Sequence, residues 1–256
     1  MQPVNLVLSG GAVRGVAHLG VIQAIMERGL VLEAISGVSS GALVGAFIAA
    51  GYEPEETLAI FKKHRLLHLI RPKLDEGLFS MKKVGEILAE YFPQNRFERL
   101  NIPLVVSCTD LTEGHSDYFT QGELIRPLIA SCSIPLLFEP VTIEGDQLVD
   151  GGFLNNLPVE PFLEDDVTLI GVHVNPWRNG MHADSLFQVM ERLVELGAWQ
   201  TVKSRKRYCD LFIEPPGMSA FGLFDENRLD ELFEIGYRYT RSKLESFTSF
   251  PNFHSR

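Results

Sequence analysis

The first fifty residues alternate between short apolar runs and segments with helical spacing. Residues 4–8 form an apolar run that stops at a serine and two glycines, a pattern typical of a buried strand ending in a flexible turn. Apolar positions then recur every three or four residues over 14–28, which predicts a helix. A second short apolar run, 32–35, leads into another glycine-containing turn and an apolar helix that ends near Gly51. The N-terminal part is therefore predicted to contain two strand-turn-helix units.

The rest of the chain repeats this alternation of strands and helices. Apolar, β-branched runs predict central strands at 103–108 and 167–174. Helical patterns predict helices at 54–69, 80–92, 185–208 and 225–247. Helices that follow strands favour an α/β fold, which we expect to be a three-layer α/β/α sandwich with a largely parallel central sheet. No internal repeat or linker-like stretch interrupts it, so we expect one domain over residues 1–256.

Charge and cysteine content narrow the classes of partner and compartment. The chain has 33 acidic and 23 basic residues, a net charge of −10, which makes nucleic acid an unfavourable partner. The longest apolar run, 42–50, is about half of the roughly 18 residues that span a bilayer, and the N-terminus has no secretory signal pattern. Three cysteines without C-x-x-C spacing fit a reducing compartment, so we expect a cytoplasmic protein without a zinc site.

A glycine-rich turn between the first strand and helix is a candidate anion site. Gly10, Gly11, Ala12, Arg14 and Gly15 lie where backbone N–H groups and a helix N-terminus can hold negative charge. The turn lacks the lysine of a P-loop, and alanine stands at the middle glycine of a dinucleotide fingerprint, although an acidic residue lies near the ribose-binding spacing. A purely structural turn also fits. The turn alone therefore predicts a geometry and leaves the ligand open.

The second turn carries a candidate nucleophile. Ser39 lies in G-x-S-x-G between a strand and a helix, where a sharp elbow projects the hydroxyl and Gly37 and Gly41 avoid side-chain clashes. The helix that follows directs its N-terminal dipole at developing negative charge. A serine N-cap exposed to solvent is the alternative interpretation. Asp150 ends an apolar run and precedes two glycines, so it is a candidate base for Ser39, although Asp-Gly is also a common turn.

Taken together, these segments resemble the patatin-like phospholipase family. The resemblance rests on L-S-G-G-A-V-R-G-V-A-H-L-G-V at 8–21, G-V-S-S-G at 37–41, A-S-C-S-I-P-L-L-F-E-P-V at 130–141 and D-G-G-x-x-N-N-L-P at 150–158, and it covers about the first 160 residues. It implies a serine acyl hydrolase acting on lipid or other acyl esters with a Ser39–Asp150 dyad, and no metal or other cofactor.

The resemblance also implies roles for the glycine-rich turn. The backbone N–H groups at Gly10, Gly11 and Ala12 would bind the oxyanion, while Arg14 and Gly15 would fix the turn. The family usually has a third glycine where this chain has Ala12. Its N–H group survives the change, so the oxyanion hole should persist, although the methyl group restricts φ and crowds the acyl carbonyl.

Two rival functions remain open at this stage. An α/β-hydrolase would use a triad in the chain order Ser, Asp, His, with His173 or His182 as the third member behind Asp150. A non-catalytic protein could instead use the glycine-rich turn to bind nucleotide phosphates. The triad predicts that replacing His173 abolishes turnover, and the binding protein predicts no dependence on Ser39.

Two further segments could contact the substrate or a membrane surface. Ile134, Leu137 and Phe138 lie in an apolar stretch between candidate catalytic segments, so they are candidates for an acyl-chain groove or for ordinary core. Residues 62–71 mix basic and apolar side chains, which fits transient membrane-surface contact as a lid or a solvated helix with one apolar stripe. The basic run 203–207 is interpreted as a charged helix end.

Overall fold

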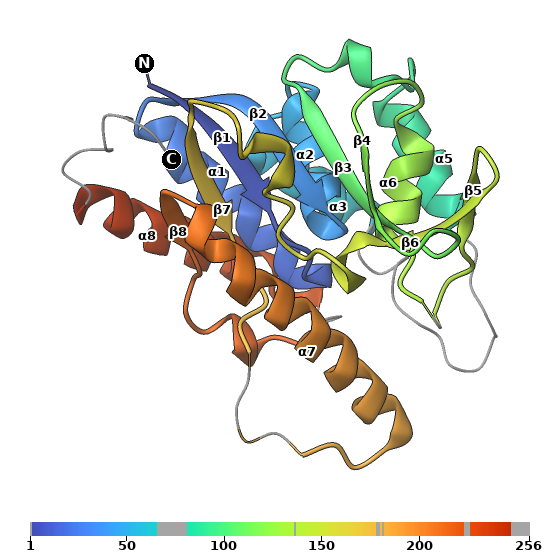
Figure 1. The fold of residues 1–256 in the computed structure, drawn as a ribbon. Coiled ribbons are helices and arrows are strands. Elements are labelled where there is room, and N and C mark those ends of the chain that lie inside the picture. Colours follow the sequence, from blue (N-terminus) through green and yellow to red (C-terminus); the bar gives the residue numbers. More distant parts are fainter. Residues whose placement is uncertain are drawn as a thin grey trace.

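The computed structural model describes residues 2–65, 81–135, 137–177, 180, 182–222 and 226–246, apart from the side chains at 187, 190, 191, 194 and 226. A twisted sheet runs through the middle of the molecule (Figure 1). Five of its strands are parallel and follow the order β3-β2-β1-β7-β8. They are β1 (Gln2–Leu8), β2 (Leu30–Val38), β3 (Leu104–Asp110), β7 (Thr168–Val172) and β8 (Leu211–Ile213).

Three short antiparallel strands extend the sheet beyond β3. They are β4 (Ser116–Phe119), β5 (Val141–Ile143) and β6 (Asp146–Asp150). Both β4 and β6 pair with β3, and β5 pairs with β6. The sequence analysis anticipated only the end of β6, where Asp150 follows an apolar run. It missed β4 and β5, which are short and contain no fully buried position.

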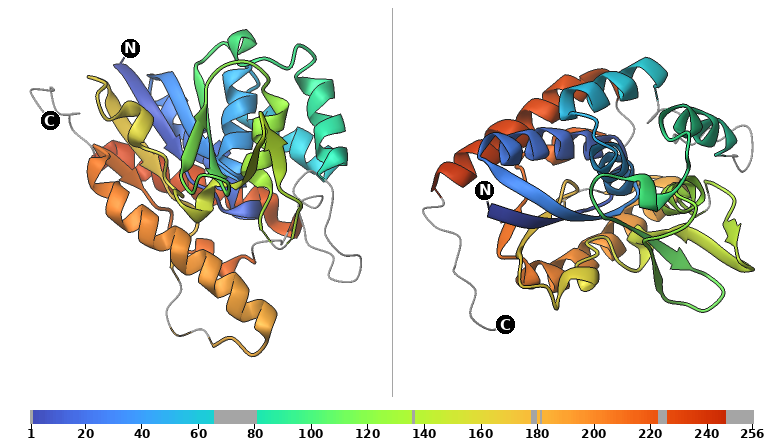
Figure 2. Two further views of the ribbon diagram at one scale, coloured as in Figure 1. Left: turned by 45° about the vertical axis from the view of Figure 1, so that its right-hand side comes forward. Right: turned by 90° about the horizontal axis from the view of Figure 1, so that it is seen from above.

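Helices cover both faces of the sheet, as two views show (Figure 2). Alternation along β1 explains why two cores form: Leu6 and Leu8 join the larger cluster, whereas Val7 faces a smaller one that includes Val202 of α7 (Leu186–Arg205). The larger cluster contains residues of α1 (Ala17–Glu27), α2 (Ser40–Ala49), α3 (Pro54–His64), α5 (Lys82–Tyr91), α6 (Ile125–Cys132) and α8 (Leu229–Ser246). The predicted three-layer α/β/α fold is confirmed.

The predicted helices are found with shifted ends. The helix expected at 54–69 corresponds to α3, which ends at His64, and residues 66–69 lie outside the described part of the chain. The helix expected at 185–208 corresponds to α7 and a following short 3₁₀ turn, η5 (Lys206–Tyr208). Among the residues with a described structure, no helix is both long and apolar enough to cross a bilayer.

Candidate active site

Ser39 lies at the sharp turn between β2 and α2. Its backbone has φ 54° and ψ −127°, a conformation that side-chain-bearing residues rarely adopt. The two glycines of the motif are required by close backbone contacts: a Cβ at Gly41 would lie 2.4 Å from the carbonyl oxygen of Leu8, and one at Gly37 would lie 2.7 Å from that of Gly41. The chain therefore turns at Ser39 in the strained strand-to-helix geometry of a nucleophile elbow.

Sheet register brings Asp150 beside this turn. Strand β3 pairs first with β2 and then with β6 along the same edge: its Ser107 pairs with Val38, the residue before Ser39, and its next residue, Cys108, pairs with Asp150. Ser39 and Asp150 line the same pocket, and the Ser39 hydroxyl lies near enough to the Asp150 carboxylate to lower its pKa. Two residues separated by 111 positions in the sequence thus meet because neighbouring positions of one central strand hold both.

The Asp150 carboxylate is buried, with 7% of the residue exposed. Burial raises its pKa from 3.8 to about 6, against the opposing effect of the Ser39 hydroxyl and of the backbone N–H of Gly152. The Gly152 N–H donates to Oδ1 over 2.8 Å and so fixes the direction of the carboxylate. The site therefore contains a carboxylate that is more basic than an exposed one and is held in place.

The end of α6 contacts both candidate catalytic residues. The Ser131 hydroxyl accepts the backbone N–H of Ser39 at 2.8 Å and donates to the carbonyl of Ser107 at 2.7 Å. The carbonyl of Ser133 accepts the N–H of Asp150 at 2.9 Å. The sequence analysis used this segment only for the family resemblance. The signal that could have identified its role is the pair of serines in the A-S-C-S string, since both are buried and can support the site by hydrogen bonds.

The glycine-rich turn lies at the end of β1, where the 3₁₀ turn η1 (Ala12–Val16) begins. Gly11 and Ala12 line the same pocket as Ser39. The Gly10 N–H, in contrast, donates to Oδ1 of Asn156 at 3.0 Å. It is therefore already bonded within the protein and does not point to a substrate oxygen. Ala12 has φ 48°, the left-handed conformation that the family's glycine would adopt without strain.

Gly15 and Arg14 fix this turn from two sides. A Cβ at Gly15 would lie 2.4 Å from the Ser40 hydroxyl oxygen, so η1 packs directly against the start of α2. The Arg14 guanidinium is buried and donates to the carbonyl of Phe221 at 3.0 and 2.8 Å and to Oδ1 of Asn175. It also lies 3.6 Å from the Glu195 carboxylate. Arg14 thus connects the turn to the last third of the chain.

These residues surround a small pocket with a volume of about 70 Å³. Ile134 lines it, whereas Leu137 packs against the large core and Phe138 is buried within it. Of the three residues predicted for an acyl groove, the structure brings one to the pocket. The sequence analysis missed six others, which come from the 150s loop, the segment after β7 and α7. The pocket is lined by Gly10, Gly11, Ala12, Ser39, Ile134, Asp150, Gly152, Phe153, Asn156, Asn175, Glu195 and Ala198.

The candidate triad histidines lie elsewhere. His173 is buried and its Nδ1 is 2.8 Å from the Glu214 carboxylate, which holds the pKa of Glu214 below its usual value. His182 is exposed. Neither residue lines the pocket. Among the described residues that line it, there is no histidine. The contacts of Asp150 therefore favour a two-residue arrangement.

The segment considered as a lid, 62–71, is described only as far as Arg65. Lys62 pairs with Asp230 of α8, and the His64 ring nitrogen Nε2 lies 2.7 Å from the Tyr91 hydroxyl. These contacts attach the end of α3 to its neighbours. The remaining positions, 66–71, lie outside the described residues.

A larger hollow, of about 390 Å³, lies near the end of α2 and is lined in part by Tyr52, Glu56, Tyr91 and Arg96. Tyr52 and Tyr91 pack edge to face there, and the Tyr52 hydroxyl donates to the Tyr91 carbonyl at 3.2 Å. None of its lining residues is a serine or cysteine that could act as a nucleophile. We therefore place the candidate active site at the smaller pocket.

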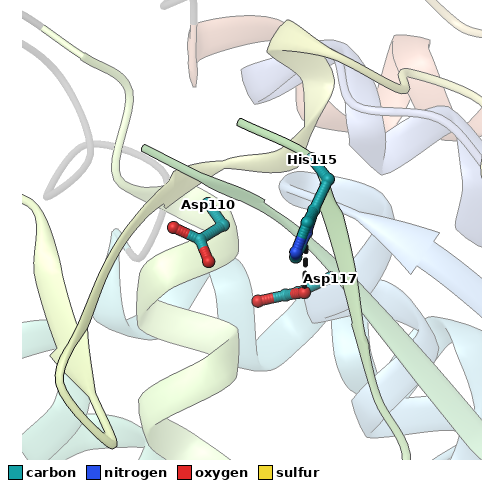
Figure 3. A group of neighbouring side chains, drawn as sticks. All are labelled: Asp110, His115 and Asp117. Carbon is teal, nitrogen blue, oxygen red and sulfur yellow. Dashed lines mark ion pairs between the residues drawn. The ribbon is translucent and has the colours of Figure 1, made fainter. Parts of the chain in front are cut away.

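A separate polar cluster lies in the β3–β4 hairpin (Figure 3). Ligand-type atoms of Asp110, His115 and Asp117 lie within 4.8 Å of one another, and His115 Nδ1 is 3.2 Å from Asp117 Oδ1. Asp110 Oδ1 also accepts the backbone N–H groups of Thr112 at 2.6 Å and Glu113 at 3.1 Å, so it shapes the turn. None of the three lines the pocket. We assign this cluster to the hairpin.

Comparison with known proteins finds relatives that are named as a lysophospholipase and as an NTE family protein. It is 30% identical over 277 residues to the lysophospholipase NTE1 of Mycosarcoma maydis, covering 95% of this chain and 15% of that one. It is 35% identical over 185 residues to an uncharacterised NTE family protein of Mycobacterium tuberculosis, covering 69% of this chain and 51% of that one. The chain thus spans about half or less of these relatives' lengths.

The fold also matches a solved structure. VipD from Legionella pneumophila superposes with a TM-score of 0.55 at 15% identity, over 96% of this chain and 67% of VipD, which shows that the fold is shared. The family profile described as Patatin-like phospholipase matches residues 6–163, which include Ser39, Asp150 and the glycine-rich turn. This chain belongs to the patatin-like phospholipase family.

Proposed function

We propose that this protein is a serine hydrolase that cleaves the carboxylic esters of lipids, either phospholipids or lysophospholipids. The observation that carries the proposal is that the Ser39 hydroxyl and the buried Asp150 carboxylate lie together in one pocket, which Gly11 and Ala12 also line. The family match and the lysophospholipase name of a relative support the substrate class.

In the first step, Asp150 accepts the Ser39 proton while the serine oxygen attacks the ester carbonyl carbon. An exposed aspartate is a weak base, but burial raises the pKa of Asp150 to about 6, so at pH 7 it is still mostly ionised and binds a proton more readily. A raised pKa thus compensates in part for the missing histidine.

The tetrahedral oxyanion accepts hydrogen bonds from the Gly11 and Ala12 N–H groups. Gly10 is not a donor in this proposal, because its N–H is already bonded to Asn156. The loss of one such donor costs about 3–4 kcal/mol of transition-state stabilisation in a serine protease, so the geometry of this turn carries much of the catalysis. Ala12, which lines the pocket, adopts φ 48° in this turn, a strained conformation for a residue with a side chain.

Collapse of the tetrahedral intermediate breaks the ester C–O bond. The leaving alcohol takes the proton from Asp150, and the acyl group stays on Ser39. Asp150 then removes a proton from an incoming water, whose oxygen attacks the acyl carbonyl, and returns that proton to Ser39 as the carboxylic acid leaves. The carboxylate therefore acts first as a base and then as an acid in each half-reaction.

The pocket is too small to enclose a whole lipid. Its volume of about 70 Å³ is well below the 300–1,000 Å³ that is usual for sites enclosing a drug-sized ligand. We infer that the ester group alone enters, between Ile134 and Phe153, while the acyl chain and head group lie outside. Access through an apolar surface fits a lipid better than a nucleotide.

The test combines covalent labelling with hydrolysis. We expect a fluorophosphonate probe to label the protein at Ser39, and Ser39→Ala to abolish both labelling and ester hydrolysis. Ser40→Ala is the matched control, because this neighbouring buried serine has no described hydrogen-bond partner for its hydroxyl. Asp150→Asn should abolish hydrolysis without unfolding the chain. Full activity in Ser39→Ala, or nucleotide binding without any labelling, would contradict the proposal.

A further inference from the structure

Exposed hydrophobic side chains gather on one part of the surface. Among the residues whose exposure is described, ten large hydrophobic side chains are exposed, and six of them lie on α7 or at the 3₁₀ turn η3 (Gly151–Phe153) and the residue after it. Leu186 and Leu193 are the most exposed, at 77% and 62%. The six residues are Phe153, Leu154, Leu186, Val189, Leu193 and Leu196. Clustering of this kind marks an interaction surface more often than scattered single residues do.

The four α7 residues form one ridge along the helix. Leu186, Val189, Leu193 and Leu196 follow the spacing i, i+3, i+7 and i+10, so they share one face. Ala198 and Val202 of the same helix are buried and lie on the opposite face, toward the protein. The N-terminal half of α7 also projects beyond the body of the molecule (Figure 1). We name the four residues the α7 ridge.

Phe153 connects this surface to the candidate active site, because it is exposed and also lines the pocket, whereas the α7 residues that line the pocket lie on the side of the helix away from the α7 ridge. Glu195 and Ala198 of α7 line the pocket, and so does Phe153 of η3, which packs beside α7. The pocket holds about 70 Å³, so the acyl chain of a bound lipid must leave it across one of these walls. The apolar side chains that it would meet there are those of η3 and α7.

Aromatic and basic residues continue the surface at the other end of α7. Trp177 and Trp199, the two tryptophans of the chain, pack against each other with ring centroids 5.7 Å apart and ring planes tilted by 31°. Lys203 lies over Trp199, 5.3 Å from its ring, and is followed by exposed Lys206 and Arg207. Half-buried tryptophans and lysines along an amphipathic helix are typical of segments that lie in a lipid head-group region. This local positive charge contrasts with the net charge of −10.

We propose that the α7 ridge, with Phe153 and Leu154, docks on the surface of anionic lipid bilayers and brings the pocket to the lipid ester. The apolar ridge would enter the head-group region, while Lys203, Lys206 and Arg207 face lipid phosphates. The part of this inference that concerns hydrolysis of a lipid ester at the docked pocket rests on the proposed function. The binding itself does not, because it needs neither Ser39 nor Asp150.

The binding test uses the full chain carrying Ser39→Ala, so that the vesicles stay intact. Sedimentation with phosphatidylcholine vesicles containing about 30% phosphatidylserine should recover the protein, and brominated lipids should quench its tryptophan fluorescence. Leu186→Ser with Leu193→Ser should weaken the partition coefficient about tenfold or more. Leu111→Ser, which changes an exposed leucine of the β3–β4 hairpin, is the matched control and should leave binding unchanged.

Activity measurements separate this inference from the proposed function. With Ser39 present, the double ridge variant should hydrolyse a soluble short-chain ester at the parent rate but should lose activity on lipid in vesicles. Absence of vesicle binding, equal binding by the ridge variant, or a dimer that the ridge variant disrupts would each overturn the docking surface. If the parent binds vesicles but hydrolyses neither substrate, the proposed function alone is overturned.

Discussion

Replacing Asp150 by asparagine tests the proposed base and the energetic cost of its burial in a single variant. Asparagine keeps the shape of the side chain and an oxygen that can accept the Gly152 N–H, now at 2.8 Å from Oδ1. It cannot ionise, however, and so cannot accept the proton of Ser39. We expect ester hydrolysis to fall by about 10²–10⁴-fold, the usual contribution of a positioned general base. We also expect the variant to be more stable than the parent at neutral pH.

The size of this stability gain follows from the pKa of Asp150. Burial raises that pKa from 3.8 to about 6, and one pKa unit corresponds to about 1.4 kcal/mol, so ionisation costs the native state about 3 kcal/mol. The cost is absent at low pH, where the carboxyl is protonated in both states. It grows as the pH rises through the interval between the unfolded and folded pKa values, and is constant above it. Asparagine avoids this cost.

Urea denaturation of both proteins over a pH series measures the effect directly. The difference between their unfolding free energies cancels the titration of all other groups, and we expect it to increase by about 2 kcal/mol in favour of Asp150→Asn between about pH 4.5 and pH 8. The kcat/KM of the parent should rise over the same range with an apparent pKa of about 6. A difference that is independent of pH, or wild-type turnover in the variant, would refute the reasoning.

Three other substitutions test single contacts of the site. Ser131→Ala removes the hydroxyl that accepts the backbone N–H of Ser39 at 2.8 Å. In steady-state assays, kcat should therefore fall about tenfold with KM little changed. Ser133→Ala is the control, because its hydroxyl only donates to the carbonyl of Ile129 in α6. Ala12→Gly should relieve the strain at φ 48° and raise the free energy of unfolding, measured by urea denaturation, by about 0.5–1 kcal/mol. Ala89→Gly, on the exposed face of α5, is the control and should lower that free energy by about 1 kcal/mol. His173→Gln should lower the free energy of unfolding by about 1–3 kcal/mol and leave turnover nearly normal. A large loss of turnover in the folded variant would instead support a Ser-Asp-His triad.

The N-terminal half of the site could be predicted from the sequence because its signals are local. A strand, a turn and a helix follow one another at the glycine-rich turn and again at Ser39, so apolar spacing and glycine positions contain most of the information. The three-layer fold followed from the same alternation. The strain at Ala12 could be anticipated from the methyl group alone, since a glycine is expected there.

The contacts that align the proposed dyad could not be predicted in this way. The hydroxyl of Ser131 meets the N–H of Ser39 across 92 positions, and Asn156 meets Gly10 across 146. Such bonds depend on sheet register, and the register of β6 was hidden because the antiparallel strands are short and irregular in pattern. The α7 wall was missed for a related reason: a helical pattern predicts that a helix forms but not which surface it covers.

The last third of the chain belongs to the site, although the family profile ends at residue 163. Arg14 shows why. Its guanidinium is 2% exposed, and its described partners, the acceptors Phe221 and Asn175 and the ion-pair partner Glu195, all lie beyond that residue. A buried cation that loses its partners costs about 3–5 kcal/mol, a large part of the stability of an ordinary domain. Because Arg14 lies in the turn that supplies the proposed oxyanion donors, the C-terminal segments hold that turn in shape while α7 provides a wall of the pocket. The residues proposed to react are thus contributed by the first 150 positions, and the geometry proposed for them depends on the remaining hundred.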